Sequence, residues 1–496
     1  MSELELKFGV DPARAAAIDA ALRRLPSRRL TVLSRYFDTP DHDLARAGLS
    51  LRLRRSDRVW EQTLKAPTER LAERLEETVP RPGRWGPDGP PIDPSLHDGS
   101  AAGKLLRAAL GDADAAAMLG PVHSCTVVRR LVEIDALGAR VEVAFDRGEI
   151  RAQAAATPVC ELEYELKHGD ARALVAFGQA GVREQGLWLG GASKAERGDR
   201  LSRGETTVAA VKAKPPRLDR DMSEPAIFRA VLTACLEQVL ANAGAVAEGH
   251  RDAELVHQLR VGLRRTRTAW RELATLADAA GPDWQAPLAE AFRALGAYRD
   301  RNTVVAGLQS RLADAGSPEP TLQASSDEPE DPVHVVRASD FQCALLDGLG
   351  LTIAEAGSDA GRDAASEPLK RIETRLDRLE KQLKRAARDF ERASPEAQHQ
   401  ARKRLKRLRY LAELVGTLYK PARVERYLAR LGPAQDALGA HIDLLVGHET
   451  ARATAAAGNP KAWFNVGWLT AQLPTSARGC RKALSRAARA EPFWKR

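Results

Sequence analysis

The sequence predicts two domains of different class, a β-rich domain with a charged interior followed by an all-α domain. From Glu3 to Lys7, charged side chains alternate with leucines, and residues 161–167 repeat this pattern with three glutamates and a lysine. Because successive side chains of a strand point to opposite faces, each stretch has one charged and one apolar face. A charged stripe that recurs on strands with apolar backs indicates a barrel with a polar lumen. A solvated sheet face with cross-strand ion pairs is the alternative.

The second domain is predicted from a change of periodicity. From Pro225 onward, strand signals nearly vanish and long segments rich in Ala, Leu and Arg show helical spacing. The Lys- and Pro-containing stretch between the two patterns reads as a linker. We therefore expect a β-rich domain over residues 1–204, a linker over 205–222 and a helical domain over 223–490.

Composition narrows the class of protein. A chain of 496 residues, 44% apolar and 29% charged, is ordinary for a globular protein of two or more domains. No run approaches the roughly 18 apolar residues of a membrane span, so no membrane contact is expected. The five cysteines lie far apart without a CxxC pair, which argues against a disulfide framework or a zinc site and fits a reducing cytoplasm.

The net charge is distributed unevenly. Residues 1–207 carry 31 basic and 31 acidic side chains, so the whole excess of +9 lies in the second half of the chain. That half is therefore the candidate for binding a polyanion. Aromatic residues make up only 5% of the sequence and are not interleaved with the basic faces, so a platform for single-stranded nucleic acid is not expected.

Charges of both signs fall on the inward faces of the predicted strands. So many like charges in one lumen would repel one another unless divalent cations neutralised the carboxylates and phosphate oxygens neutralised the bases. This reasoning predicts a site for a metal and a polyphosphate together. The inward set comprises Glu3, Glu5, Glu142, Asp146, Glu161, Glu163 and Glu165, with Lys7, Arg52, Arg54, Lys65, Lys167 and Lys194.

Seven motifs in order give residues 1 to about 204 a specific resemblance to the CYTH, or triphosphate tunnel, family. The resemblance implies an eight-stranded antiparallel barrel with flanking helices, and hydrolysis or cyclisation of triphosphates with Mg²⁺ or Mn²⁺. The motifs are ExExK at Glu3–Lys7, YFDTPD at Tyr36–Asp41, LSLRLR at Leu49–Arg54, QTLK at Gln62–Lys65, FDRGEI at Phe145–Ile150, ELEYELKHG at Glu161–Gly169 and SKAERG at Ser193–Gly198.

The resemblance also implies roles for individual residues. Glu5 and Glu163 are expected to be catalytic. Arg129 competes with Arg130 as the inward arginine of its strand if the register differs. Two residues depart from the family pattern: Thr78 replaces an acidic residue, and Asp199 replaces an aromatic one. The metal ligands implied are Glu3, Glu5, Asp146, Glu161, Glu163 and Glu165, and the triphosphate contacts are Lys7, Arg52, Arg54, Lys65, Arg130, Lys167, Lys194 and Arg197.

The chemistry implied is positioning and charge neutralisation, because phosphoryl transfer asks little covalent chemistry of a protein. One metal would bridge phosphate oxygens, and a second would orient a water molecule. The sequence has no Walker-type loop, so an ordinary P-loop ATPase is not expected.

An internal repeat organises the helical half. Two sets of basic residues, 142 positions apart, share the spacing 3, 4 and 3, which places each set on one helical face. Solvated helix faces are the alternative to an anion site. The segments VHQLRVGLRRTR and HQARKRLKRLRY resemble the CHAD family, which implies two four-helix repeats whose basic faces bind inorganic polyphosphate. The residues concerned are His257, Arg260, Arg264 and Arg267, with His399, Arg402, Lys403, Lys406 and Arg409.

Together these features predict a cytoplasmic inorganic triphosphatase, located at polyphosphate granules, whose helical domain binds polyphosphate. One alternative is a granule-binding protein with little or no catalysis. Another is a tunnel enzyme of the thiamine-triphosphatase or adenylate cyclase type. No base-binding pocket is evident in the sequence, so nucleotide cyclisation ranks last among these.

Overall fold

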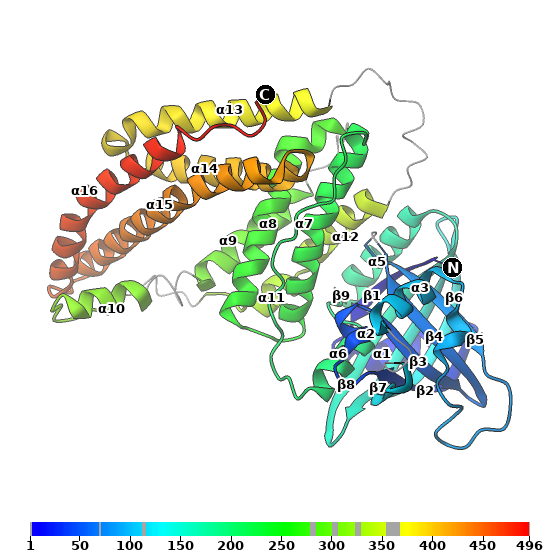
Figure 1. Cartoon of the computed structure of the whole chain (residues 1–496). Helices are drawn as coiled ribbons and strands as arrows, with labels where there is room; N and C mark the ends of the chain where they lie inside the picture. Colours follow the sequence, from blue (N-terminus) through cyan, green and yellow to red (C-terminus); the bar gives the residue numbers. More distant parts are fainter. Residues whose placement is uncertain are drawn as a thin grey trace. The chain divides into compact units, whose positions relative to one another are not determined.

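The computed structural model describes residues 2–68, 71–111, 116–277, 284–299, 306–322, 329–353 and 368–495. The chain forms two compact units (Figure 1). The first comprises Met1–Val211, Leu240–Arg251 and Val336–Ala354, and the second comprises Lys212–Val239, Asp252–Val335 and Glu355–Arg496. The predicted boundaries at 204 and 223 divide the chain differently and stay predictions.

A closed barrel of eight antiparallel strands forms the centre of the first unit, which confirms the predicted fold. The order around the barrel is β5-β4-β3-β2-β6-β7-β8-β1, and pairing of β1 with β5 closes it. The two-residue strand β9, Trp188–Leu189, adds to β1. The barrel strands are β1 Ser2–Gly9, β2 Ser27–Asp38, β3 Ser50–Ser56, β4 Val59–Pro67, β5 Glu73–Pro80, β6 Gly120–Ala136, β7 Ala139–Ala152 and β8 Ala155–His168.

Helices cover the apolar outer face of the barrel. Leu51 of β3 and Leu64 of β4 are fully buried in one cluster with Leu106 of α3 (Ala101–Leu110). On another side, the ring of Tyr164 lies 4.9 Å from that of Phe177 in α5 (Ala171–Gln185). Because this face is buried against helices, alternation turns the charged face of each strand toward the lumen. The shorter helices α1 (Ala15–Arg23) and α2 (Asp43–Arg46) complete the cover.

Helix α6, Lys194–Ser202, lies against one end of the lumen. Its first turn is fixed by a capping box, in which Ser193 and Glu196 exchange hydrogen bonds with each other's backbone. Ala195 and Leu201 pack on a buried cluster that includes Tyr36 and Val127 from the inner faces of β2 and β6. This end of the lumen is therefore apolar, and α6 presents its charged residues to the carboxylates beyond it.

Part of the helical half of the chain packs on the barrel within the first unit. Helix α12, Ser339–Ile353, lies along α5, where Gln179 donates a hydrogen bond of 2.7 Å to Asp347. The buried Gln342 accepts a hydrogen bond of 2.8 Å from the backbone N–H of Leu189. The Arg337 guanidinium, at the end of α11 (Pro332–Arg337), lies 3.7 Å from the centre of the Trp188 ring.

Helices make up the rest of the described chain, which confirms the all-α prediction for the second half. Helix α7 is long and apolar enough to cross a membrane, contrary to expectation, but 72% of that stretch is buried inside the protein. The buried core helix of a globular protein has the same length and apolar composition, so this feature alone is weak evidence for a membrane span. The remaining helices are α7 Glu224–Ala247, α8 Ala253–Leu273, α9 Gln285–Arg299, α10 Ala306–Asp314, α13 Pro368–Asp389, α14 Pro395–Val415, α15 Pro421–Ala456 and α16 Ala462–Ala487.

Candidate functional site

Strand register brings the charged stripes together inside the barrel. Glu163 of β8 stands opposite Lys7 of β1, and Asp146 of β7 stands opposite both Glu161 and Arg129. Residues from four strands thus meet in one part of the lumen, although they are up to about 160 positions apart in the sequence.

Three carboxylates form a compact acidic group there, which we call the three-acid group: Asp146, Glu161 and Glu163. One oxygen from each lies within 4.8 Å of the others. The Lys194 ammonium, from the start of α6, contacts all three, at 2.8 Å from Asp146 and 2.7 Å from Glu163. Arg129 donates two hydrogen bonds of 2.7 Å to Asp146 and one to Glu163. Buried carboxylates this close together persist only because cations compensate them.

The pKa shifts follow from that pairing. Burial by itself raises the pKa of the Asp146 and Glu163 carboxyls, but the charges of Lys194 and Arg129 outweigh it, so both pKa values lie below the usual range. Conversely, burial opposes the charge of Lys194, while Asp146 and Glu161 hold the pKa of its ammonium well above the usual value. Asp146 and Glu163 therefore stay ionised and attract cations.

A second group of charges surrounds Lys65. Its ammonium lies 3.0 Å from Glu3, 2.5 Å from Glu76 and 3.9 Å from Glu5. Burial, and then the hydrogen bond to Glu76, raise the pKa of Glu3 to about 9. Burial raises the pKa of Glu76, but the hydrogen bond from Glu3 and the charges of Lys65 and Arg52 outweigh burial. The pKa of Glu76 therefore lies below its usual value. Of this pair, Glu3 therefore holds a proton more readily than Glu76.

Glu76 belongs to this site, although the sequence did not assign it a role. It lies on β5, where Glu76 and Glu77 follow one another, so the charge pattern alone does not show which of them faces inward. Its register opposite Lys65 decides the question. Two residues further along β5, Thr78 also faces the lumen and shares a hydrogen bond of 3.2 Å with Thr63. The family resemblance implies an acidic residue at this position.

The remaining predicted lumen residues form a partly exposed basic and acidic lining. Arg52 lies 3.9 Å from Glu76, and Arg54 lies 3.4 Å from Glu61. Arg197 of α6 contacts Glu161 at 3.1 Å. Lys167 is separate from the three-acid group, because it pairs at 2.6 Å with Glu165 and at 3.4 Å with Glu142. The structure therefore brings Glu165 and Lys167 together beside Glu142, and Glu165 stands opposite Glu5 in the pairing of β8 with β1.

The prediction for Arg130 is wrong, and Arg129 takes its place. Adjacent residues on a strand point to opposite faces, so a shift of one residue moves a side chain out of the lumen. Arg130 points outward and donates a hydrogen bond of 2.7 Å to Asp19 of α1, a residue that also pairs with Arg23. Arg129 points inward to Asp146.

Replacing Arg130 by Gln should therefore lower stability without changing the KM for a substrate bound in the lumen. The hydrogen bond from Arg130 lowers the pKa of Asp19, so its stabilisation is present above the usual carboxyl pKa and is lost as pH falls. Because Arg23 still pairs with Asp19, we expect a loss on the order of 1 kcal/mol at pH 7, shrinking in acid. Thermal melts and steady-state kinetics check this. A raised KM with an unchanged melting temperature would instead place Arg130 at the substrate.

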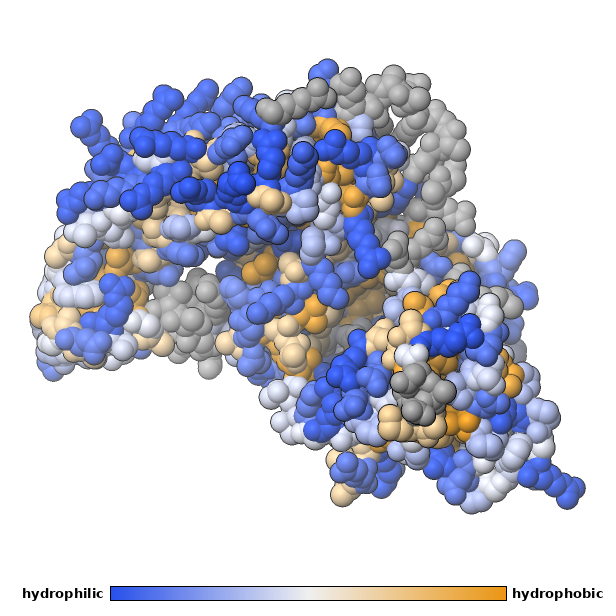
Figure 2. Space-filling view, viewed as in Figure 1, coloured by the Kyte–Doolittle hydropathy of each residue, from blue (hydrophilic) through white to orange (hydrophobic). Residues whose placement is uncertain are grey.

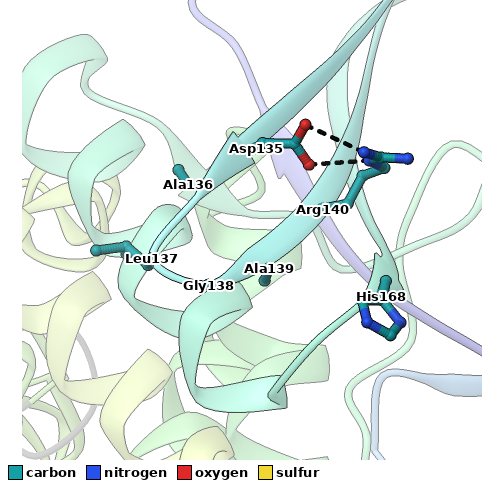
Figure 3. Close-up of a pocket in the computed structure, with 7 residues that line it drawn as sticks. All are labelled: Asp135, Ala136, Leu137, Gly138, Ala139, Arg140 and His168. Carbon is teal, nitrogen blue, oxygen red and sulfur yellow. Dashed lines mark hydrogen bonds and ion pairs between the residues drawn. The ribbon is translucent and has the colours of Figure 1, made fainter.

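A cleft at the turn between β6 and β7 is a further feature of the barrel (Figure 3). The charges that line it neutralise each other, since Arg140 donates hydrogen bonds of 2.9 and 3.2 Å to Asp135. His168 lies exposed at its edge. The cleft therefore lacks the concentrated charge of the lumen, and we place the candidate active site in the lumen.

The predicted basic faces of the helical half lie on α8 and α14, which pack on each other. Arg265 of α8 and Arg409 of α14 both pair with Glu413, at 3.1 and 2.8 Å. Burial, together with the positive charges of neighbours that include Lys403 and Arg264, lowers the pKa of His399. The charge of Arg264 on α8 therefore reaches His399 on α14, so the two basic faces lie close together.

Arg260 is the least accessible member of these faces. It is only 9% exposed, and it donates a hydrogen bond of 2.7 Å to the backbone carbonyl of Phe292 on α9. Its guanidinium lies 4.4 Å from the centre of the Phe292 ring, and that of Arg264 lies 4.8 Å from the same centre. Gly296 leaves room for Arg260, because a Cβ there would collide with the guanidinium. The other predicted residues of this set, His257 and Arg267 on α8 and Arg402 and Lys406 on α14, lie on the same two helices.

Comparison with known proteins agrees with this architecture. Residues 1–198 match the CYTH domain family and residues 230–452 match the CHAD domain family, so the chain carries a CYTH domain followed by a CHAD domain. An inorganic triphosphatase from Haemophilus influenzae is 28% identical over 204 residues. That alignment spans 40% of this chain and 54% of the relative, so it relates the chain to about half of that protein.

Solved structures are similar to the two halves separately. A CHAD domain from the plant Ricinus communis is 26% identical, covering 56% of this chain and 97% of that one, with a TM-score of 0.43. A putative adenylyl cyclase from Hippeastrum, described as having a dominant triphosphatase activity, is 18% identical over 41% of this chain and 97% of that one, with a TM-score of 0.30.

Proposed function

We propose that the barrel is a metal-dependent inorganic triphosphatase, which hydrolyses triphosphate to pyrophosphate and phosphate. The observation that carries the proposal is the pairing of the three-acid group with a lining of arginines and lysines inside one closed barrel. The CYTH match and the related inorganic triphosphatase support the same reaction class.

The acidic residues fit a hard divalent cation. Carboxylate oxygens are the ligands that Mg²⁺ and Mn²⁺ prefer. The ammonium of Lys194 contacts all three carboxylates, which supports the proposal that the group binds a cation. Asp146, Glu161 and Glu163 would hold the metal, with Glu3 and Glu5 on the neighbouring strand. When bound, Mg²⁺ or Mn²⁺ supplies positive charge that polarises phosphate oxygens and a water molecule.

The protein's own residues position the triphosphate and neutralise its charge. Lys7, Arg52, Arg54 and Arg129 present cationic groups to the lumen, where they would pair with phosphate oxygens. Hydrolysis joins a water oxygen to the terminal phosphorus and breaks the bond from that phosphorus to the bridging oxygen, which leaves with pyrophosphate. Preorganised cations lower the barrier because they already face the oxygens on which charge develops.

Two alternatives to an inorganic triphosphatase make different predictions about activity. A granule-binding protein without catalysis would not need buried charges of both signs, and Asp146 and Glu161 are almost fully buried at a cost that binding on an outer surface does not require. A thiamine-triphosphatase or cyclase-type enzyme would prefer a nucleoside or thiamine triphosphate. A panel of triphosphate, pyrophosphate, ATP and thiamine triphosphate, each with Mg²⁺ and with Mn²⁺, tests this. We expect the highest kcat/KM for triphosphate, and preference for another substrate would reassign the enzyme.

For the helical half, we propose that the faces on α8 and α14 bind inorganic polyphosphate. The support is the proximity of the two basic faces and the lowered pKa of His399, which burial and then the positive charges of Lys403, Arg402 and Arg264 produce. A polyanion would relieve that repulsion, and each contacted phosphate would release a counterion.

The barrel should be active without the CHAD domain. All predicted lumen residues precede Gly204, so a chain of residues 1–204 should hydrolyse triphosphate with a similar kcat. Its melting temperature should be lower, because removal of α12 leaves the Leu189 N–H without Gln342 and uncovers α5. Circular dichroism melts and phosphate release check both points. A folded but inactive truncated chain would show that the helical half contributes to the site.

A further inference from the structure

A second cluster of metal-ligating side chains lies where α6 meets the turn from β2 into α2, apart from the three-acid group. His42 Nδ1 and Asp199 Oδ1 are 2.6 Å apart, although the residues are 157 positions apart in the sequence. Asp38, at the end of β2, completes a set whose ligand atoms all lie within 4.8 Å of one another. His42 is partly exposed, with 21% of its side chain accessible, so solvent reaches the cluster.

A buried histidine beside this cluster points to a ligand. His123 of β6 is only 7% exposed, and among the described residues neither of its ring nitrogens has a hydrogen-bond partner. A buried imidazole without partners is costly and calls for an explanation. The ring stacks on Tyr36 with centres 4.4 Å apart and lies against Gly198, the neighbour of Asp199, where a Cβ would collide with it.

The surroundings hold these groups in position. Asp38 accepts backbone hydrogen bonds of 2.8 to 2.9 Å from Thr39, Leu44 and Ala45, which fix its carboxylate and leave it further acceptor capacity. Asp199 and His42 are the charged groups that act on His123. Asp199 also pairs at 2.8 Å with Arg203, the residue that follows the end of α6.

We propose that Asp38, His42 and Asp199 bind zinc, with His123 beside them, and that the ion fastens α6 to the barrel. One imidazole nitrogen and two carboxylate oxygens are donors that Zn²⁺ takes in four-coordinate sites whose fourth ligand is water, whereas Mg²⁺ prefers oxygen ligands alone. The two carboxylates would balance the charge of the ion, which would take the place of the direct contact between His42 and Asp199. Because α6 also carries Lys194 and Arg197, the ion would hold these side chains at the three-acid group. This role is separate from the Mg²⁺ or Mn²⁺ of the proposed reaction.

Cobalt provides a direct test in the full chain. The protein is stripped with a chelator and titrated with Co²⁺ alone, since four-coordinate Co²⁺ absorbs visible light far more strongly than the six-coordinate ion expected at carboxylates. We expect one equivalent with the four-coordinate spectrum, displaced by one equivalent of Zn²⁺. His42→Ala and the isosteric Asp199→Asn should lose it, with Zn²⁺ affinity falling at least on the order of a hundredfold.

Matched variants separate this site from others. His168→Ala removes an exposed histidine of the same barrel (Figure 3), and Glu163→Gln alters the lumen; both should keep the four-coordinate spectrum. Zn²⁺ should also raise the melting temperature of the wild type and of His168→Ala, but not that of Asp199→Asn. A wild type without the four-coordinate spectrum, or equal Zn²⁺ affinity in a folded Asp199→Asn protein, would overturn the proposal.

Discussion

Replacing Glu163 by Gln should lower the turnover of triphosphate on the order of a hundredfold or more, as loss of a central electrostatic group typically does. The substitution keeps the shape of the side chain but removes the charge that contacts Arg129 and Lys194 at 2.7 Å. It also removes one of the three acids that would hold the metal, so the metal concentration needed for half-maximal activity should rise. Glu5→Gln should act in the same direction.

Glu149→Gln is the matched control for this experiment. Glu149 lies on β7, three residues after Asp146, but its side chain is exposed and pairs with Arg151. Its loss removes the same charge from the barrel without touching the lumen, so turnover should stay at the wild-type level. If the folded Glu163→Gln and Glu5→Gln proteins both retained wild-type turnover, the metal would have to be held elsewhere.

Neutralising both basic faces of the CHAD domain should weaken the binding of long-chain polyphosphate at least tenfold at low salt and flatten its salt dependence, since fewer counterions are released. We would change Arg264, Arg267, Lys403 and Lys406 to Gln. Arg260 is left intact, because its contacts with Phe292 and its burial mean that replacing it would also disturb α9. Filter binding or calorimetry across a series of salt concentrations measures the effect.

The control removes four positive charges from the same unit at another place. Figure 2 shows hydrophilic side chains over α13, and the exposed basic residues on and just after this helix include Lys381, Arg385, Arg388 and Arg392. Their replacement by Gln should change polyphosphate binding little, and neither variant should alter triphosphate hydrolysis. Equal losses in both would indicate a general effect of net charge, and the site on α8 and α14 would be withdrawn.

Strand periodicity places charges on one face where they stand two residues apart, as Glu161, Glu163 and Glu165 do. Alternation along a strand does not identify the inward residue where two charged residues are adjacent in the sequence. Arg129 and Arg130 differ by one position, and only the contact with Asp146 or with Asp19 distinguishes them. In the same way, the Glu76–Glu77 pair does not alternate, so the inward glutamate follows from its register with Lys65.

Contacts between distant segments could not be predicted from local pattern. Nothing in the spacing of residues 42, 123 and 199 shows that the fold brings them together beside α6. The packing of α12 on α5 likewise depends on which apolar faces match. Many helices of similar composition have the same sequence pattern, so the pattern does not identify the helix on which α12 packs. The barrel could be predicted from the resemblance of its motifs to a known family. The contacts between side chains could be seen only in the structure.

The most direct test of the proposed function follows the products of triphosphate hydrolysis by phosphorus NMR. With the full chain and Mg²⁺ or Mn²⁺, we expect one pyrophosphate and one phosphate from each triphosphate, and no reaction once a chelator removes the metal. Hydrolysis that continued at the same rate in the chelator, or a chain that bound polyphosphate but left triphosphate intact with either metal, would contradict a metal-dependent triphosphatase.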